Sequence, residues 1–274
     1  MTPRGQPVPF CSKKSKQTDI FSCDVSGGSL KPTSTMTNIA RKLLPLAAVL
    51  LSAAGTLPAA SLSQDFDNVP ALFTSGWVNI NRSTTTGSTS WFQGNDAVFP
   101  AQQGGSTSYI GANFNATTGT NTISLWLLTP TMTFVNGDTI SFFTRTPTGS
   151  PFPDRLEVRL SLAGVSTNVG STATSVGDFT TLLLTVNSGL TVGGYPENWT
   201  QFTATISGLA APTDGRLAFR YFVTNGGPTG DNSNYIGIDT LRITPVPEPS
   251  ITALFGAAGL GGLVMLIRRR RSAA

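Results

Sequence analysis

Arg155-Leu156-Glu157-Val158-Arg159-Leu160 is the stretch of this sequence that decides the fold, because charged and apolar side chains alternate along it at every residue. A period of two places the leucines and the valine on one face of a β-strand and the charged residues on the other. The pattern predicts a half-buried strand with its apolar face turned inward. Arg155, Glu157 and Arg159 are then expected to form a row on the surface.

Short runs of a similar kind lie on both sides of this strand. They are rich in β-branched, aromatic and leucine residues, and clusters of Gly, Asn, Pro, Ser and Thr separate them, which is typical of strands joined by turns. No segment between residues 61 and 247 has a convincing helical period. We therefore predict an all-β domain, an antiparallel β-sandwich whose two sheets bury the alternating apolar rows. The further predicted strands are 123–128, 139–144, 181–186, 199–206, 217–223 and 235–243.

Charge is segregated along the 274 residues. The formal net charge is +4, but every lysine lies within the first 42 residues and four arginines lie at 268–271. Between residues 61 and 247, seven arginines and eleven acidic residues give a formal net charge of −4. This middle part lacks the positive charge that binding to nucleic acid or to an anionic membrane requires. No nucleic-acid partner is predicted.

The residue types that most often carry catalysis are scarce. The chain has no histidine, and its two cysteines, Cys11 and Cys23, lie far upstream of the predicted strands. The sandwich therefore lacks a thiol nucleophile, an imidazole base and a Cys/His metal site. Asp154 and Glu157 are not expected to act as a glycosidase pair, because an offset of three on a strand places them on opposite faces. We predict a protein that is not an enzyme and has no catalytic residues; a hydrolase that uses carboxylates alone is an alternative.

The last thirty residues combine three features in a fixed order. Pro247-Glu248-Pro249 is followed by an uncharged apolar run, 251–267, and then by four arginines. About seventeen residues at 1.5 Å per residue form a helix of roughly 25 Å, which is at the short limit for crossing a bilayer. The arginines hold their end in the cytoplasm, so the folded body is expected on the opposite side. The prolines keep Glu248 in an extended segment just outside the membrane.

This tail resembles a PEP-CTERM sorting signal, the C-terminal tag of exopolysaccharide-producing Gram-negative bacteria that the membrane enzyme exosortase recognises. The resemblance assigns Pro247, Glu248 and Pro249 as the sorting motif. It implies an exosortase-type partner, a transient anchor in the inner membrane, and delivery to the cell surface or the extracellular matrix. A plain C-terminal tail anchor with a proline-rich spacer is the alternative. The cytoplasmic stop is formed by Arg268, Arg269, Arg270 and Arg271.

A second targeting segment is predicted near the other end. From Met36, a start with Arg41 and Lys42 leads into an apolar run, 43–57, and then into small residues, which is the composition of a secretory signal peptide. It implies the secretory translocon as a partner, with cleavage between residues 59 and 63. We predict four parts: an extension upstream of the true start (1–35), a signal helix (36–60), the β-sandwich (61–245) and a sorting segment with a transmembrane helix (246–274).

The body also resembles the choice-of-anchor J domain of exported bacterial proteins, which is related to jelly-roll adhesin and MAM-type modules. The resemblance covers nearly the whole body. It implies a jelly-roll-like sandwich with a role at the surface and does not imply a reaction. The matching stretches are 65–68 with Gly76-Trp77, 124–130, 137–142, 155–158, 216–221 and 236–243.

Two ligand sites follow from the residue types. Calcium needs only oxygen ligands, and Asp65 or Asp67 can meet Asp239 if the first and last strands are neighbours. The alternative is that Asp67 and Asn68 cap a turn while Asp239 bonds backbone amides. Trp126 lies in the most apolar strand and is predicted to be buried. Trp91 is the predicted surface tryptophan, on which a polysaccharide can stack in a carbohydrate-binding or calcium-dependent adhesion module.

Overall fold

The computed structural model describes residues 61–246. The predicted extension, signal helix, sorting motif, transmembrane helix and arginine cluster lie outside these residues. Within them are a short helix, α1 (Val69–Leu72), a 3-10 turn, η1 (Phe114–Ala116), and strands that make up the rest of the regular structure. The strands are β1 (Leu62–Gln64), β2 (Val78–Asn81), β3 (Phe92–Gln93), β4 (Ile110–Asn113), β5 (Asn121–Leu128), β6 (Met132–Phe134), β7 (Thr139–Arg145), β8 (Leu156–Ser161), β9 (Thr181–Val186), β10 (Thr200–Thr205), β11 (Thr213–Gly226) and β12 (Tyr235–Thr244).

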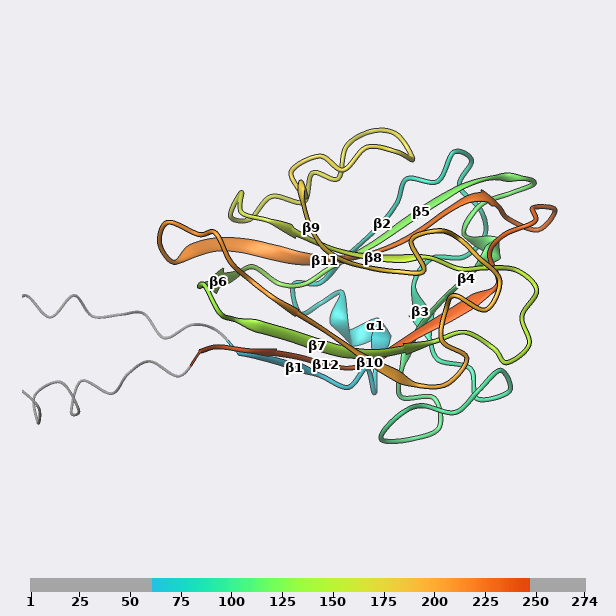
Figure 1. The fold of residues 1–274 in the computed structure, drawn as a ribbon, viewed down its shortest axis with the longest axis horizontal. Coiled ribbons are helices and arrows are strands. Elements are labelled where there is room, and N and C mark those ends of the chain that lie inside the picture. Colours follow the sequence, from blue (N-terminus) through green and yellow to red (C-terminus); the bar gives the residue numbers. More distant parts are fainter. Residues whose placement is uncertain (1–60, 247–274) are drawn as a thin grey trace, which may run out of the picture. The chain divides into compact units, whose positions relative to one another are not determined.

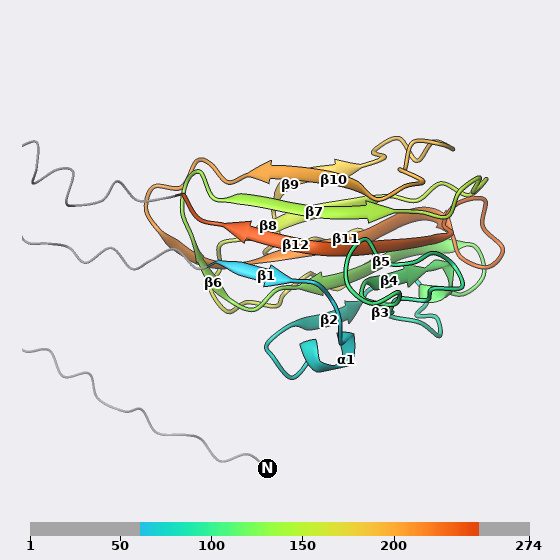
Figure 2. The same cartoon turned by 90° about the horizontal axis from the view of Figure 1, so that it is seen from below.

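The strands form two antiparallel sheets that pack face to face, which confirms the predicted β-sandwich (Figures 1 and 2). We call the lower sheet in Figure 1 sheet A; its order is β10-β7-β12-β4-β3, with β1 paired to β12. Sheet B has the order β2-β5-β11-β8-β9, with β6 paired to β11. Most connections cross from one sheet to the other, so most neighbouring strands of a sheet are not consecutive in the sequence; β3 with β4 and β8 with β9 are the exceptions.

The main core lies between the sheets and follows the predicted alternation. Leu156, Val158 and Leu160 of β8 are buried there, as the period of two predicts. Phe142 from sheet A meets Phe219 from sheet B edge to face, with 5.0 Å between the ring centroids. Each buried side chain of this size stabilises the folded state by roughly 1.5–3 kcal/mol.

The outer face of sheet A carries a second group of buried aromatic side chains. This group consists of Phe99, Tyr109 and Tyr235. The rings lie over two glycines, Gly237 of β12 and Gly111 of β4, which are direct partners in the strand pairing. A Cβ atom on Gly237 would lie only 2.8 Å from the Trp199 ring. Glycine is therefore required in the middle of this strand so that the rings can reach the backbone.

The outer face of sheet B is covered by the long connection between β8 and β9. We call this connection, residues 162–180, the cover loop; it lies along the upper side of sheet B in Figure 1. Both outer faces are thus partly closed to solvent. The sequence pattern predicted open, polar outer faces.

The first and last strands of the domain are neighbours. Leu62 in β1 lies opposite Ile243 in β12, so the described chain begins and finishes at one end of the sandwich. The predicted calcium site required the first and last strands to be neighbours, so that Asp65 or Asp67 could approach Asp239, and they are neighbours. Between residues 61 and 246, no helix has the length and apolar character needed to cross a bilayer.

Candidate functional site

The cover loop binds to sheet B through a small apolar cluster. Phe179 and Val169 are buried against Trp126, and the rings of Phe179 and Trp126 have centroids 5.7 Å apart. Trp126 is buried, as predicted, but it lies under the loop on the outer face of sheet B and not between the two sheets. These contacts fix the loop as part of the folded structure.

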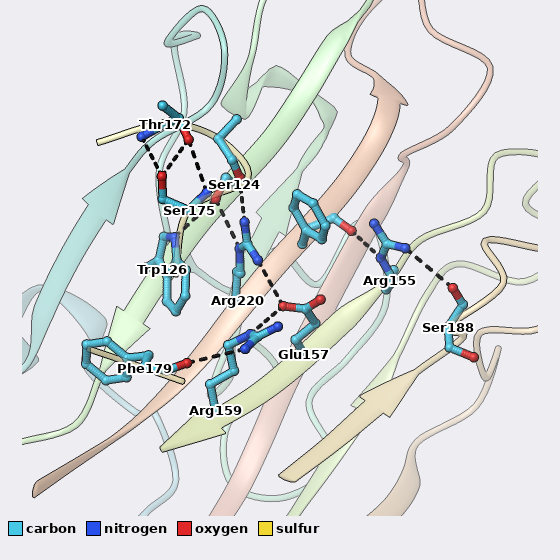
Figure 3. A network of polar contacts seen from close by, with 12 residues as sticks. Ser124, Trp126, Arg155, Glu157, Arg159, Thr172, Ser175, Phe179, Ser188 and Arg220 are labelled. Atoms are coloured by element: carbon cyan, nitrogen blue, oxygen red, sulfur yellow. Dashed lines mark hydrogen bonds and ion pairs between the residues drawn. The ribbon is translucent and has the colours of Figure 1, made fainter. Parts of the chain in front are cut away.

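Arginine side chains then tie the backbone of the loop to the sheet. Hydrogen bonds from a charged donor are stronger than neutral ones, and a carbonyl at the inner side of a loop needs a partner once it is buried. Figure 3 shows two of these arginines, Arg159 and Arg220, at the centre of the network. The four donations are Arg216 to Val165, Arg82 to Gly170, Arg220 to Ala173 and Arg159 to Phe179.

Glu157 lies beneath the loop between two of these arginines (Figure 3). One oxygen of its carboxylate accepts from Arg159 Nε at 2.7 Å and from Arg220 Nη1 at 3.1 Å. Glu157 is only 7% exposed and Arg220 only 1%. All three side chains of the predicted row, Arg155, Glu157 and Arg159, lie on the outer face, as predicted, but the prediction that Glu157 is exposed there is wrong, because the cover loop excludes solvent from its carboxylate; Arg155 and Arg159 are half-buried.

The charges of this network remain in place at neutral pH. Burial alone would raise the pKa of Glu157, but the hydrogen bond from Arg159 and the charge of Arg220 outweigh it and lower that pKa below its usual value. Burial lowers the pKa of Arg220 to about 10, which still leaves the guanidinium protonated. Arg220 also lies over the rings of Trp126 and Phe222, 4.8 and 3.7 Å from their centroids, so aromatic faces share its charge.

Beside the network, the cover loop and the edge of sheet B enclose a cleft of about 540 Å³. One wall continues β2 along the start of β5, since the amides of Arg82 and Thr84 donate to Ser124 and Thr122. The opposite wall is the stretch of the loop that includes Ala173, whose carbonyl accepts from Arg220. The lining residues are Asn81, Arg82, Ser83, Thr84, Thr86, Thr122, Ser171, Thr172, Ala173 and Thr174.

Hydroxyl groups dominate this cleft and Arg82 is its only charged residue. Such a lining can donate and accept many hydrogen bonds, but it offers no nucleophile with a neighbouring base. Its chemistry suits the binding of a polyhydroxylated ligand. No direct signal in the sequence points to this cleft, because its walls come from segments about ninety residues apart and their serines and threonines are ordinary loop residues.

The structure does not bring the three predicted calcium ligands together. Asp65 forms an ion pair with Arg242 at 2.6 Å, and Asp67 is exposed. The carboxylate of Asp239 accepts from the amides of Gln102, Gln103 and Thr240, as the alternative interpretation expected. Asn68, and not Asp67, caps a turn: its side chain accepts from the Ala71 amide at the start of α1. In the part of the chain that the structure describes, no three His, Cys, Asp or Glu side chains form a group suited to a metal.

Trp91 does not lie on the surface. It is 3% exposed and belongs to the main core between the sheets, so the prediction of an exposed stacking residue is wrong. Tryptophan in a sandwich is more often buried than its flanking polar residues suggest, because the large ring is needed to fill the core.

Asp154 is also fully buried, and no arginine is among its hydrogen-bond partners in the described residues. Its carboxyl group lies within 2.8 Å of Thr146 Oγ1, Tyr221 Oη and the amide of Asn234. Burial raises its pKa to about 6, against the opposing effect of these hydrogen bonds. No cation of the described residues neutralises it, and the three contacts fix its position within the core.

No known protein-family profile matches this chain, and no curated protein matches it in sequence. Among solved structures, it is similar to the K1 cleaved adhesin domain of Lys-gingipain from Porphyromonas gingivalis W83, at 20% identity over 69% of this chain and 99% of that domain, with a TM-score of 0.48. It is also similar to a family 11 carbohydrate-binding module from Clostridium thermocellum, at 13% identity over 70% of this chain and 99% of that one, with a TM-score of 0.38. The sandwich itself is established by the strand pairing described above.

Proposed function

We propose that this protein is an exported, non-enzymatic β-sandwich that is sorted through its C-terminal segment to the cell surface or the extracellular matrix. The observation that carries the proposal is the sequence of the tail. Pro247-Glu248-Pro249 comes first, the apolar run 251–267 follows, and the four arginines 268–271 come last. The signal-like segment 36–60 supports the same route. An exosortase-type enzyme and the secretory translocon are the partners of this route, and the inner membrane is a temporary location.

The position of the domain ends supports a display role. Ser61 and Leu62 lie beside the residues that follow β5, while the cleft contains Thr122 at the start of β5. Six residues of strand separate these two places by roughly 20 Å. The described chain therefore starts and finishes at one end of the sandwich, and the cleft lies toward the other end.

The use of the buried carboxylates supports a role without catalysis. Glu157 is bonded to two arginines, and Asp239 accepts from three amides. A general acid or base must have a lone pair or a proton free for a substrate. Among the described residues, each of these two carboxylates is already engaged by structural partners.

The test is to express the full chain in a Gram-negative host that makes an exosortase, and to fractionate the cells. We expect the wild-type protein at the surface or in the medium, shortened near Pro247-Glu248-Pro249. A Glu248→Ala variant should remain uncut in the membrane fraction, while Glu197→Ala, which removes a carboxylate from the sandwich, should behave as the wild type. Intact wild-type chain in the cytosol, still with residues 36–60, would contradict the proposal.

Binding of extracellular polysaccharide is the second candidate function. The hydroxyl-lined cleft at the end away from the domain termini is the observation that favours it. Sugars present many hydroxyl groups, which exchange hydrogen bonds with serine, threonine and asparagine side chains. This candidate moves the predicted binding site from the buried Trp91 to the cleft.

A further inference from the structure

Arg82 differs from every other arginine of the sandwich in how its guanidinium group is used. Its Nε donates to the carbonyl of Gly170 at 3.0 Å, and its side chain is exposed at the cleft. Within residues 61–246, its two terminal nitrogens have no hydrogen bond or ion pair. The six other arginines, which are Arg145, Arg155, Arg159, Arg216, Arg220 and Arg242, each use at least one terminal nitrogen in such a contact.

We propose that the cleft binds an acidic polysaccharide and that the terminal nitrogens of Arg82 recognise a carboxylate group of its sugar units. This inference depends on the second candidate function, polysaccharide binding, and adds the class of ligand. The two terminal N–H groups of a guanidinium form a planar fork that fits both oxygens of a carboxylate. The bond from Nε to Gly170 already orients this fork, so less side-chain freedom is lost on binding.

The charges around the cleft favour the same class of ligand. The four arginines that donate to the cover loop, Arg82, Arg159, Arg216 and Arg220, lie there with the acidic residues Glu157 and Asp178, which gives a local formal charge of 4 − 2 = +2. The residues from 61 to 247 together carry −4. An anionic chain is therefore attracted to this face and repelled by the rest of the domain, which directs it to the cleft.

The lining also argues against a neutral glucan as the preferred ligand. No aromatic side chain lines the cleft, so the apolar face of a sugar ring has no ring on which to stack. Recognition must come from polar contacts to the edge of the sugar. A uronic acid unit supplies both the hydroxyl groups for Thr84, Thr122 and Ser171 and the carboxylate for Arg82.

The experiment compares two ligands with the same sugar chain, one with free carboxylates and one in which methyl esters remove their charge. The full-length chain, in detergent, is titrated with oligogalacturonate and with the same oligosaccharide fully methyl-esterified. We expect at least tenfold tighter binding of the acidic form, and a difference that shrinks as salt is added. Arg82→Gln should lose at least tenfold in affinity for the acidic form. Arg242→Gln removes the same charge at the opposite end of the domain and should change the affinity less than twofold.

The outcomes separate the two ideas. Equal affinity for both oligosaccharides, or full affinity in Arg82→Gln, would overturn the acidic specificity and leave polysaccharide binding intact. Binding of neither oligosaccharide at millimolar concentration, nor of any other glycan on an array, would overturn polysaccharide binding as well. Because Arg82 also holds Gly170, hydrogen exchange at the Asp178 amide, which donates to Asn168 within the cover loop, checks that the loop of the variant is still in place. A variant with wild-type exchange at this amide and reduced binding supports direct recognition.

Discussion

Glu157 is the one acidic residue in a buried group of arginines, and its removal leaves two cations without a counter-charge. Breaking a buried pair on one side is costly because the remaining charge stays desolvated. Arg220 is 1% exposed and has no second carboxylate among its partners. We therefore expect Glu157→Gln to lower the free energy of unfolding by about 3 kcal/mol. Urea unfolding at neutral pH measures this.

Arg242 provides the matched control for that prediction. Its ion pair with Asp65 is equally short, at 2.6 Å, but both side chains are about one-third exposed. Exposed pairs contribute little because water and salt screen them. Arg242→Gln should therefore cost less than about 1 kcal/mol. Equal losses in the two variants would mean that the cover loop does not shield Glu157 from solvent.

The contacts of Asp154 are best satisfied when this residue is protonated. The hydroxyl of Thr146 lies 2.7 Å from Asp154 Oδ2 and also donates to the carbonyl of Tyr235. A single hydroxyl proton cannot serve both acceptors, but a protonated Oδ2 can donate to Thr146, which then donates to Tyr235. The other oxygen accepts from Tyr221 and Asn234 in either state. This arrangement agrees with the raised pKa of about 6.

The raised pKa of Asp154 predicts a protein that is more stable in mild acid. The value in the folded state, about 6, lies above the ordinary 3.8, so between these values the folded protein binds more protons than the unfolded one. The free energy of unfolding must then fall as pH rises from about 4 to about 7, by roughly 3 kcal/mol from this group. Asp154→Asn, which can make the same hydrogen bonds without a proton, should remove that share of the pH dependence.

Asp239 and Glu157 also contribute to the pH dependence of the free energy of unfolding, and their contributions remain in the Asp154→Asn variant. Burial also raises the pKa of Asp239 to about 6, so some slope of the same sign should remain in Asp154→Asn. The lowered pKa of Glu157 has the opposite sign, and its contribution is lost only as pH falls below its usual value. An Asp154→Asn protein with the same pH profile as the wild type would show that Asp154 does not titrate in this range.

At the level of the elements, the long strands could be predicted from the sequence. The segments that cover the outer faces of the sheets could not. All seven predicted strands exist, with bounds that differ by at most four residues, because each buries a regular apolar row between the sheets. The short strands β1, β2, β3, β4 and β6 were missed, since two to four residues give too few repeats to detect a period. The same limit applies to α1, which has a single turn.

The cover loop and its cleft were beyond sequence reasoning for a different reason. Eleven of the nineteen loop residues are Gly, Ser, Thr or Asn, and its apolar residues are scattered among them, which predicts an exposed connection. It is ordered because Phe179 finds a pocket beside Trp126 and because arginines from β8 and β11 reach its carbonyls. Those partners are twenty to fifty-three residues away in the sequence. The mistaken expectation of an exposed Glu157 has the same origin, since alternation distinguishes the two faces of a strand but does not show what covers each face.

Two glycines of the cover loop allow a matched test of its structure. Gly170 has a φ of +83°, and a Cβ there would lie 2.2 Å from the side chain of Ser175. Gly164 has a φ of +60°, but open space surrounds it. Alanine at either position bears the strain of a positive φ, about 1 kcal/mol, but only Gly170→Ala adds a steric clash. We expect this variant to loosen the loop.

Hydrogen exchange measures this effect at the Asp178 amide, which donates to the carbonyl of Asn168 within the loop. Exchange there should be at least tenfold faster in Gly170→Ala than in Gly164→Ala, because local opening of the loop exposes this amide. The amides of β11 should exchange at the same rate in both variants. Identical protection of Asp178 in the two proteins would mean that the loop can shift to accept the extra methyl group.

At the scale of the whole molecule, the sandwich is closed by its own ends. β1 pairs with the second half of β12, so the described chain starts and finishes on neighbouring strands at one end of sheet A. No disulfide contributes, because the two cysteines of the chain precede residue 24. Because the sandwich contains no cysteine, a disulfide introduced into it can be detected without interference from native cysteines there. Its formation tests whether β1 and β12 are paired, and whether the protein folds in an oxidising compartment.

Ser63 and Arg242 are direct partners in the pairing of β1 with β12. We expect Ser63→Cys with Arg242→Cys, in a chain with Cys11 and Cys23 replaced by serine, to form a disulfide when the protein is exported. Directly opposed strand residues have Cα atoms roughly 4.5–5.5 Å apart, within the range that a disulfide spans. The closed loop of about 180 residues would stabilise the protein by about 5 kcal/mol in the chain-entropy account. Gel mobility without reductant detects the bond.

Deleting residues 36–60 distinguishes the two properties that this disulfide tests, which are the pairing of β1 with β12 and the export of the protein. The shortened chain should stay in the cytosol, where thiols are kept reduced, and should show free cysteines there although the same strands are paired. Adding an oxidant to the purified reduced protein should then close the bond, because the geometry does not depend on the compartment. If the oxidant fails to close it, the pairing of β1 with β12 is wrong. If the bond forms only after oxidant in the full-length protein as well, the strands are paired but the proposal of export fails.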